Sequence, residues 1–189
     1  RNIFASAALE QNKMTINSFV GSLFDSNTKV QPDSNLYING MIDFTKFFEP
    51  RYNIKALGKD IYFRSLDGDI EAYSDLDVSI KGKDTIDITG TITARNGAIY
   101  SEFNTDKTPE SFNEISRTKT NYNIRFPIKD SFAIRNSQID ATILGEIAIN
   151  RSNDSDWNYS GEIELMEGEI YYYLGDVFKN LRGIFLFGI

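Results

Sequence analysis

Hydrophobic and polar residues alternate along most of this chain with a period of two. Leu76, Val78 and Ile80 fall on one side of an extended backbone, while Asp77 and Ser79 fall on the other. Successive side chains of a β-strand point to opposite faces, so this pattern is typical of a strand with one buried face. No segment shows a sustained helical period, and isoleucine, tyrosine, phenylalanine and threonine are abundant. The pattern therefore predicts an all-β fold.

The longest alternating run covers residues 138–150. Its apolar phase holds Ile139, Ala141, Ile143, Ile147 and Ile149. At roughly 3.3 Å per residue this strand would be nearly 40 Å long. Because most strands have no more than about ten residues, the run predicts an unusually long strand.

Glycine recurs inside these strands, at positions where the apolar side chains would point inward. Gly40, Gly90 and Gly145 each have apolar residues two and four positions away on both sides. Glycine normally weakens a strand, so its recurrence in one phase predicts a sharp bend where a side chain would collide with a neighbouring strand. We expect the three glycines to stack and form a crease.

A longer internal repeat joins two segments of the chain. Residues 90–100 and 161–171 share the pattern G-x-I-x-h-x-x-G-x-I-Y, in which h is apolar. The Asn96-Gly97 dipeptide within the first copy predicts a hairpin turn, and Glu167-Gly168 stands at the matching place. Repetition of a β unit predicts an elongated sheet in which each unit rests on its neighbours.

Two polar stretches interrupt the alternation. Residues 104–123, which include Pro109, read as a long loop or insertion. Residues 151–158 read as a second polar loop. The chain begins without methionine and ends within an apolar segment, so we expect residues 1–189 to be one fragment of a larger domain.

Composition excludes several kinds of active site. The chain has no cysteine and no histidine, so thiolate nucleophiles, disulfides, zinc fingers and Ser-His-Asp triads are excluded. A metal ion would need oxygen ligands. The formal net charge of −7 would repel phosphate backbones, so nucleic acid is not an expected partner. No apolar run approaches the length of a membrane-spanning helix.

Three clusters suggest chemistry, and a simpler interpretation is favoured for each. The oxygen-rich residues Asn153, Asp154, Ser155, Asp156 and Asn158 lack the glycine and terminal glutamate of an EF-hand, so they read as a solvated loop. The pairs Glu162/Glu164 and Glu167/Glu169 have a spacing close to that of glycosidase carboxylates, yet they share the polar phase and should be solvated. Alternation divides Tyr171, Tyr172 and Tyr173 between two faces, which disfavours a sugar-binding platform. We therefore expect no catalytic residues, no metal and no cofactor.

The order of motifs in the last third of the chain resembles a known family. The segment 126–136 is followed by the long strand with Gly145, by a G-x-I-x-L-M-E-G-x-I-Y-Y-Y-L-G stretch from Gly161, and by Gly183-Ile184-Phe185-Leu186-Phe187. This succession resembles the C-terminal domain of the TamB family, which belongs to the AsmA-like, bridge-like lipid transfer proteins. Met166 and Glu167 stand where that family often carries a basic residue.

The resemblance implies an elongated sheet that curves lengthwise into a β-taco with a hydrophobic groove. It also implies a non-enzymatic conduit, anchored in the inner membrane of a diderm bacterium and spanning the periplasm. Such a conduit is implicated in phospholipid transport between the two membranes and in outer-membrane protein assembly. The implied partners are phospholipid acyl chains, an Omp85-type outer-membrane protein (TamA where present) and nascent outer-membrane β-strands.

A groove of this kind would be lined by the apolar phase of the strands. Burying hydrocarbon against such a strip keeps both from water, at roughly 25 cal/mol per Å². The residues expected to line it are Ile38, Ile42, Ile86, Ile88, Ile92, Ile139, Ile143, Ile147, Ile149, Ile163 and Leu165.

Two other classes of protein share some of these features. A transmembrane outer-membrane β-barrel also alternates and is rich in aromatic residues, but its apolar phase faces lipid and glycine there is unfavourable. An extracellular carbohydrate-binding or adhesive β-sandwich would use the same apolar phase as a closed core.

Overall fold

Every regular element in the described part of the chain is a β-strand. The computed structural model describes residues 3–22, 35–65, 68–102, 119–153, 155–171 and 177–188, without the side chains of Ser131 and Tyr171. The strands are β1 (Ile3–Glu10), β2 (Lys13–Gly21), β3 (Leu36–Asp43), β4 (Arg51–Arg64), β5 (Ile70–Gly82), β6 (Thr85–Ile99), β7 (Lys119–Arg135), β8 (Ile139–Ser152), β9 (Asn158–Tyr171), β10 (Val177–Phe178) and β11 (Gly183–Phe187).

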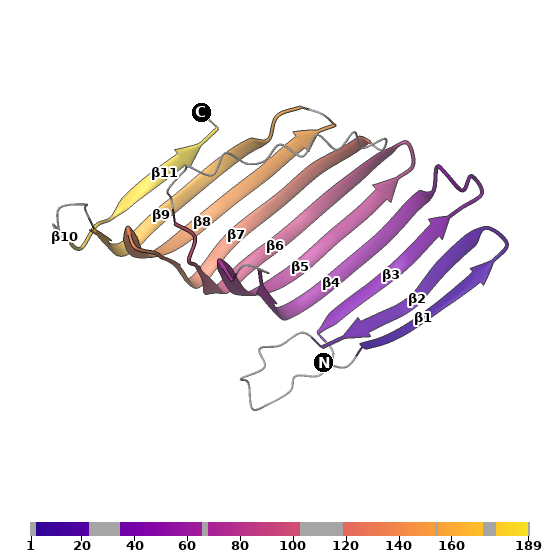
Figure 1. Ribbon diagram of the computed structural model, residues 1–189, viewed down its shortest axis with the longest axis horizontal. Coiled ribbons are helices and arrows are strands. Elements are labelled where there is room, and N and C mark those ends of the chain that lie inside the picture. Colours follow the sequence, from indigo (N-terminus) through magenta and orange to yellow (C-terminus); the bar gives the residue numbers. More distant parts are fainter. Residues whose placement is uncertain are drawn as a thin grey trace.

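The eleven strands form one sheet in sequence order (Figure 1). Neighbouring strands are antiparallel except β6 and β7, which are parallel. At the C-terminal end, β10 and β11 both pair with β9. Because the strands follow one another along the longest dimension, cross-strand rows of side chains run lengthwise (Figure 1). The all-β fold expected from the alternation is confirmed, as is the elongated, curved sheet expected from the internal repeat and from the family resemblance.

The long strand predicted over residues 138–150 is β8, which extends two residues further, to Ser152. The polar loop predicted over residues 151–158 is correspondingly shorter, because β9 begins at Asn158. The loop predicted over residues 104–123 is wrong at its end, since β7 begins at Lys119. Parallel pairing with β6 gives these polar residues partners: the amide Nδ2 of Asn121 donates to Asp87 Oδ1 at 2.8 Å. Residues 104–118 lie outside the described residues.

The hairpin predicted at Asn96-Gly97 is wrong, because both residues lie inside β6. Ser74 of β5 pairs with Ala94 and Tyr73 pairs with Asn96, so Arg95 is an extra residue in β6. Gly97 is needed there since a Cβ would lie 2.2 Å from the carbonyl oxygen of Glu71. The Asn-Gly sequence therefore marks a β-bulge and not a chain reversal.

The second copy of the repeat has its bulge at the matching position. Ile143 of β8 pairs with Leu165 and Thr142 pairs with Glu167, so Met166 is the extra residue in β9. Met166 corresponds to Arg95 in the alignment of the two copies. The repeated motif thus encodes a strand that bulges at a fixed place.

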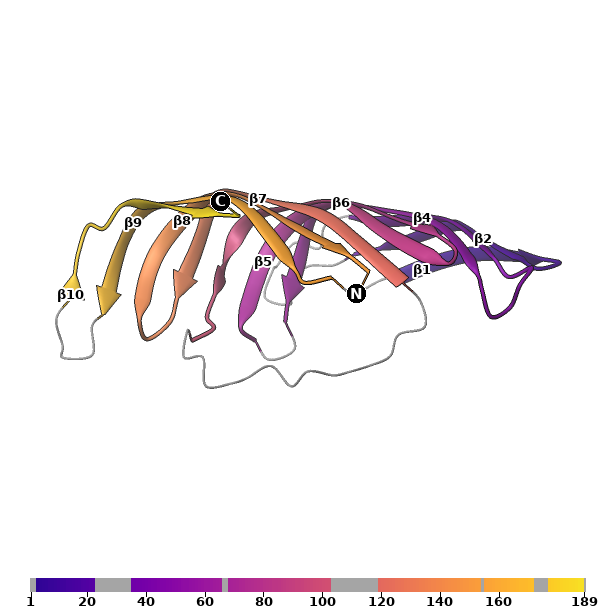
Figure 2. The ribbon, with the colours of Figure 1, turned by 90° about the horizontal axis from the view of Figure 1, so that it is seen from above.

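These bulges belong to a continuous line of register shifts, which we call the bend line. Bulges increase local twist and kink a strand. In Figure 2 the ends of β5 to β9 turn toward one side of the sheet, which makes that side concave. The shifts fall at Gly58/Ile61 in β4, Tyr73/Ser74 in β5, Ala94/Gly97 in β6, Ile128/Phe132 in β7 and Thr142/Ile143 in β8.

The three in-phase glycines lie where a neighbouring strand comes too close for a side chain, as predicted. At Gly145 the φ angle is +136° and a Cβ would lie 2.1 Å from the carbonyl oxygen of Glu162. Gly40 and Gly90 have the same geometry against β4 and β5. They do not stack, however, because each pairs with non-glycine residues such as Ile54, Val78 and Ile163. The crease is built from bulges, and of the three glycines only Gly145 adjoins it.

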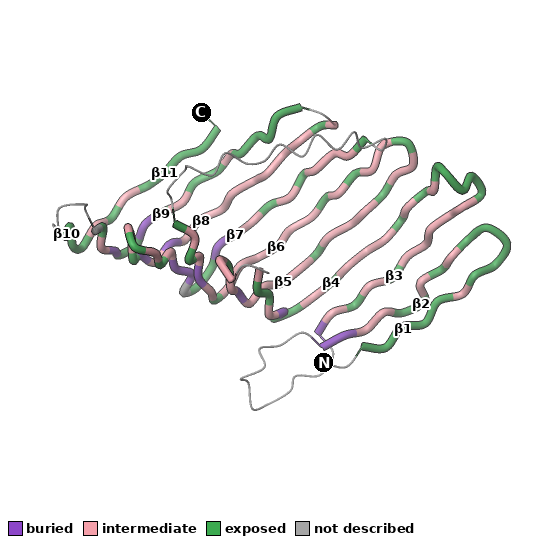
Figure 3. The backbone as a smooth tube through the Cα atoms, in the orientation of Figure 1, coloured by how far each residue is buried: buried purple, intermediate pink, exposed green. Residues whose placement is uncertain are grey.

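A small packed cluster fills the inner side of the bend line. Figure 3 shows the buried positions gathered where β5 to β9 turn. Ile143 is its most buried member, with 2% of its surface exposed. The cluster consists of Ala72, Ile128, Phe132, Ala141, Ile143 and Leu165, with Ala94, Ile99, Ile134, Ile139, Ile163 and Leu181 packed against it.

Candidate functional site

The concave face of the sheet carries the apolar phase of the strands. Side chains in this phase alternate with polar ones that project from the convex face, as Ile88 does with Thr89. All strands of the described chain belong to one sheet, so within that part no second sheet covers the concave face. This face is therefore the candidate site for an apolar ligand.

Cross-strand pairing joins the concave side chains into continuous apolar rows. One row crosses six consecutive strands from β3 to β8 through Ile38, Ala56, Val78, Gly90, Ile124 and Ile149. A second row joins Ile54, Ile80 and Ile88 on β4, β5 and β6. Directly opposed side chains are the closest neighbours that a sheet offers, and in the first row only Gly90 has no side chain to contribute. Apolar surface thus extends lengthwise without a polar interruption in the first row.

Seven of the expected lining residues lie on the open stretch of this face, beyond the packed cluster. Each is half-buried, which leaves part of its hydrocarbon surface accessible. Ile139 and Ile163 are also half-buried, but they pack against the cluster. The seven are Ile38, Ile42, Ile86, Ile88, Ile92, Ile147 and Ile149.

Two expected lining residues are instead core residues. Ile143 and Leu165 oppose each other across β8 and β9 and are almost fully buried in the cluster. Alternation could not reveal this, because it gives the face of a residue and not its distance from the bend. The sharp curvature also brings Phe132 and Ala141 into this cluster. Ile143 and Leu165 are therefore covered by neighbouring side chains and closed to a ligand.

The expected lining residues leave out five side chains of the concave rows, namely Ile54, Ala56, Val78, Ile80 and Ile124. Ile54 and Ile124 occupy the apolar phase of their strands, between Tyr52 and Ala56 and between Tyr122 and Phe126. The alternation around them was the available signal. The predicted loop extended to residue 123, next to Ile124. Because β7 in fact begins at Lys119, the alternation around Ile124 continues on both sides of it.

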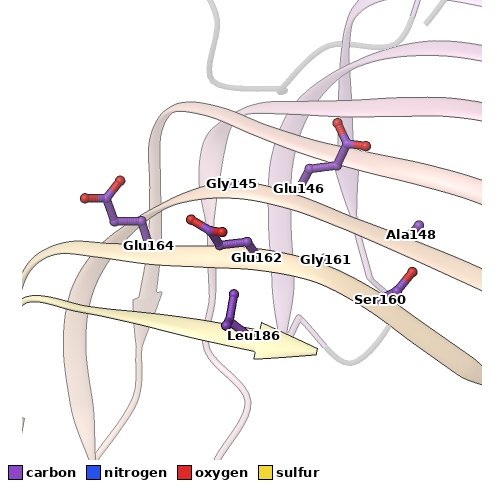
Figure 4. A pocket seen from close by; sticks show the side chains of 8 residues that line it. All are labelled: Gly145, Glu146, Ala148, Ser160, Gly161, Glu162, Glu164 and Leu186. Carbon is purple, nitrogen blue, oxygen red and sulfur yellow. The ribbon is translucent and has the colours of Figure 1, made fainter. Parts of the chain in front are cut away.

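The convex face is polar and carries an open depression of about 620 Å³ over β8, β9 and β11 (Figure 4). Glu146, Glu162 and Glu164 project into it beside Leu186. Glu146 and Glu162 are directly opposed, and Glu146 accepts a hydrogen bond from Arg125 Nε at 2.6 Å. Within the described ranges, no group of three or more carboxylates is placed to hold a metal ion.

Aromatic and cation–π contacts join the loop between β8 and β9 to β7 and β8. The guanidinium of Arg151 lies 4.9 Å from the ring centre of Trp157, and the ring centre of Tyr122 lies 5.1 Å from it, with the two ring planes tilted by 43°. Arg151 Nε also donates to the carbonyl of Ser155 at 3.0 Å. Asp154, one of the oxygen-bearing residues considered for calcium, lies outside the described residues. So do Tyr172 and Tyr173 and the side chain of Tyr171.

An ion pair on the convex face ties the bend line together. Arg95, the extra residue of β6, donates through Nε to Asp75 Oδ2 at 2.8 Å. The backbone N–H of Asp60, at the bulge in β4, donates to Asp75 Oδ1 at 2.9 Å. The hydrogen bond from Arg95 is the main cause that holds the pKa of Asp75 below its ordinary value. Three strands therefore meet at one carboxylate where the sheet bends.

We expect Asp75→Asn to lower the free energy of unfolding at neutral pH by up to about 1 kcal/mol. Because folding depresses the pKa of Asp75, its contribution is complete above the unfolded value of 3.8 and is lost as the pH falls through the folded value. Urea unfolding at neutral and acidic pH should therefore show a wild-type advantage that shrinks in acid. Glu164→Gln, on the same convex face, should show no such difference. An advantage for wild type that is equal at both pH values would contradict this role.

No helix within the described part of the chain is long and apolar enough to cross a lipid bilayer. No family model, curated protein or solved structure matches the chain. The concave apolar face and the curvature of the sheet are the features that bear on its function.

Proposed function

We propose that this chain is part of a non-enzymatic conduit of the TamB type, whose concave face carries the acyl chains of phospholipids. In this proposal it lies in the periplasm, within a protein anchored in the inner membrane. It moves lipid between the inner and outer membranes and supports assembly of outer-membrane proteins. An Omp85-type protein at the outer membrane is its partner.

One observation carries this proposal: an apolar row without a polar residue runs lengthwise on the concave face of a single curved sheet, and no other strand of the described residues lies over it. The row from Ile38 to Ile149 crosses six strands along the long dimension of the molecule. An ordinary core would have a second layer against such a row. Exposed apolar surface costs roughly 25 cal/mol per Å², so a hydrocarbon ligand that covers it is favoured.

Continuity suits transport better than a single pocket would. An acyl chain that leaves a bilayer for water loses roughly 0.8 kcal/mol per CH₂ group. A strip of aliphatic side chains offers nearly the same environment as the bilayer interior and offsets most of that loss. Successive positions along the row are all apolar, so movement from one to the next meets no polar barrier. Polar contacts selective for one position would trap the lipid.

The proposal is tested by comparing lipid capture by a photo-crosslinking amino acid at position 88 with capture by the same amino acid at position 89. Ile88 lies on the open stretch of the concave face, whereas its neighbour Thr89 is exposed on the convex face. In cells that produce the whole protein, we expect the concave position to capture phospholipid and the convex position to capture little. Mass spectrometry of the adducts identifies the lipid.

A second measurement is made on purified protein. Lipids extracted after native purification should be retained by wild type and reduced by Ile88→Glu, which places a charge on the open stretch without touching the packed cluster. Equal capture at positions 88 and 89, or a wild-type protein free of lipid, would overturn the proposal.

A further inference from the structure

The second apolar row of the concave face ends at a cation. Ile88 of β6 is opposed by Tyr122 of β7, and Tyr122 is opposed in turn by Arg151 of β8. The row stops there, because β9 begins at Asn158, opposite Asn150, and has no residue beside Arg151. Among the paired positions of the concave phase in the described strands, Arg151 is the only one that carries a charge. A charge at this single place is not expected from the apolar pattern of the face.

The side chain of Arg151 is held in a defined position. Its guanidinium stacks on the ring of Trp157, and its Nε donates to the carbonyl of Ser155. A guanidinium is planar, so stacking on one face leaves its edge available for hydrogen bonds in the plane. The two Nη groups are therefore the donors that a ligand on the concave face can use.

Arg151 has no anionic partner among the described residues. Three arginines of the convex face each pair with a carboxylate, as Arg125 does with Glu146. Asp156, in the same loop as Trp157, is exposed and forms no ion pair with Arg151. A half-buried, unpaired guanidinium favours a ligand with a phosphate or carboxylate, to which it can donate two parallel hydrogen bonds.

The apolar part of the row has the length of one acyl chain. Neighbouring strands lie about 4.8 Å apart, so the three steps from Ile54 through Ile80 and Ile88 to Tyr122 span about 14 Å. One leaflet is half of a hydrocarbon core that is about 30 Å thick, so acyl chains extend about 15 Å along it. A chain that lies on this row therefore brings its headgroup to Arg151, one strand further.

We propose that Arg151 binds the phosphate of a phospholipid whose acyl chain lies along the second row. This inference rests on the proposed conduit and adds an orientation, with the headgroup at the β8–β9 loop and the chain end toward β4. The first row has no charged residue and so offers no such contact. Arg151 therefore provides a station at which one lipid is held, beside a row along which lipids move.

Binding of two fluorescent lipids to the purified, lipid-free whole protein tests this role. One is phosphatidylglycerol, and the other is the diacylglycerol with the same acyl chains but no phosphate. We expect wild type to bind phosphatidylglycerol about tenfold more tightly, and Arg151→Gln to lose this preference while its affinity for diacylglycerol stays the same. Arg151→Lys should keep part of the preference, because it keeps the charge without the planar pair of donors.

Arg125→Gln is the matched control, since it makes the same change in net charge on the convex face and should keep the full preference. Inorganic phosphate, at concentrations equal to those of the saturating lipid, should not displace phosphatidylglycerol, because it makes no contact with the row. A preference that survives Arg151→Gln, an equal loss in Arg125→Gln, or displacement by inorganic phosphate would overturn the headgroup site. Equal binding of both lipids by wild type would overturn this site alone, whereas binding of neither lipid would overturn the conduit as well.

Discussion

Gly145→Ala is expected to lower the free energy of unfolding by about 3 kcal/mol or more. The φ angle of +136° is one that residues with a Cβ rarely adopt. The added Cβ would lie 2.1 Å from the carbonyl oxygen of Glu162 and 3.0 Å from the Cα of Ile163. Backbone atoms of β9 cannot move aside without breaking the pairing between β8 and β9. Urea unfolding measures the loss.

Gly183→Ala is the control for this substitution. Gly183 also lies in a strand, β11, but an added Cβ would meet no atom within 4 Å. We expect a change within about 0.5 kcal/mol, as for other uncrowded surface positions. If the two alanine variants had equal stability, β9 could not lie as close to β8 as the structure places it, and the explanation for the in-phase glycines would fail.

Ile143→Ala is expected to destabilise the protein by about 3 kcal/mol, whereas Ile88→Ala should cost less than half as much. Ile143 is 2% exposed and contacts the other members of the packed cluster, so its truncation leaves a cavity. Ile88 lies half-buried on the open stretch of the concave face, where solvent or a ligand can fill the space. Urea unfolding of lipid-free protein gives both values.

Lipid retention should rank these two variants in the opposite order. Truncation of Ile88 removes surface that a ligand contacts, whereas truncation of Ile143 removes surface that only the cluster contacts. Retained lipid, measured under conditions where both variants stay folded, should therefore decrease for Ile88→Ala alone. Equal costs in stability would show that Ile88 also belongs to a closed core.

Much of the fold was accessible from sequence because a strand has a strict period of two. Alternation located β8 to within two residues at its C-terminal end and assigned Ile38, Ile88 and Ile149 to a common face, which the cross-strand rows confirm. The glycines at positions 40, 90 and 145 were correctly interpreted as places of close strand approach. These properties are local: they depend on which side of its own strand a residue occupies.

The register and curvature of the sheet could not be predicted from the two-residue alternation. The Asn96-Gly97 dipeptide is compatible with a hairpin or with a bulge, and only pairing with β5 on one side and β7 on the other decides for the bulge. The start of β7 at Lys119 likewise depends on a parallel partner, β6, that is distant in sequence.

The sequence alone determined that this is an all-β chain with one apolar and one polar face, because side-chain direction in a strand follows from backbone geometry. The tertiary structure alone decided which apolar residues are open and which are buried. Register shifts on successive strands align into a bend line, and that bend packs Ile143 and Leu165 together while Ile88 and Ile149 stay on the open stretch. Burial depends on distances between strands far apart in the sequence, and no pattern within one strand contains that information.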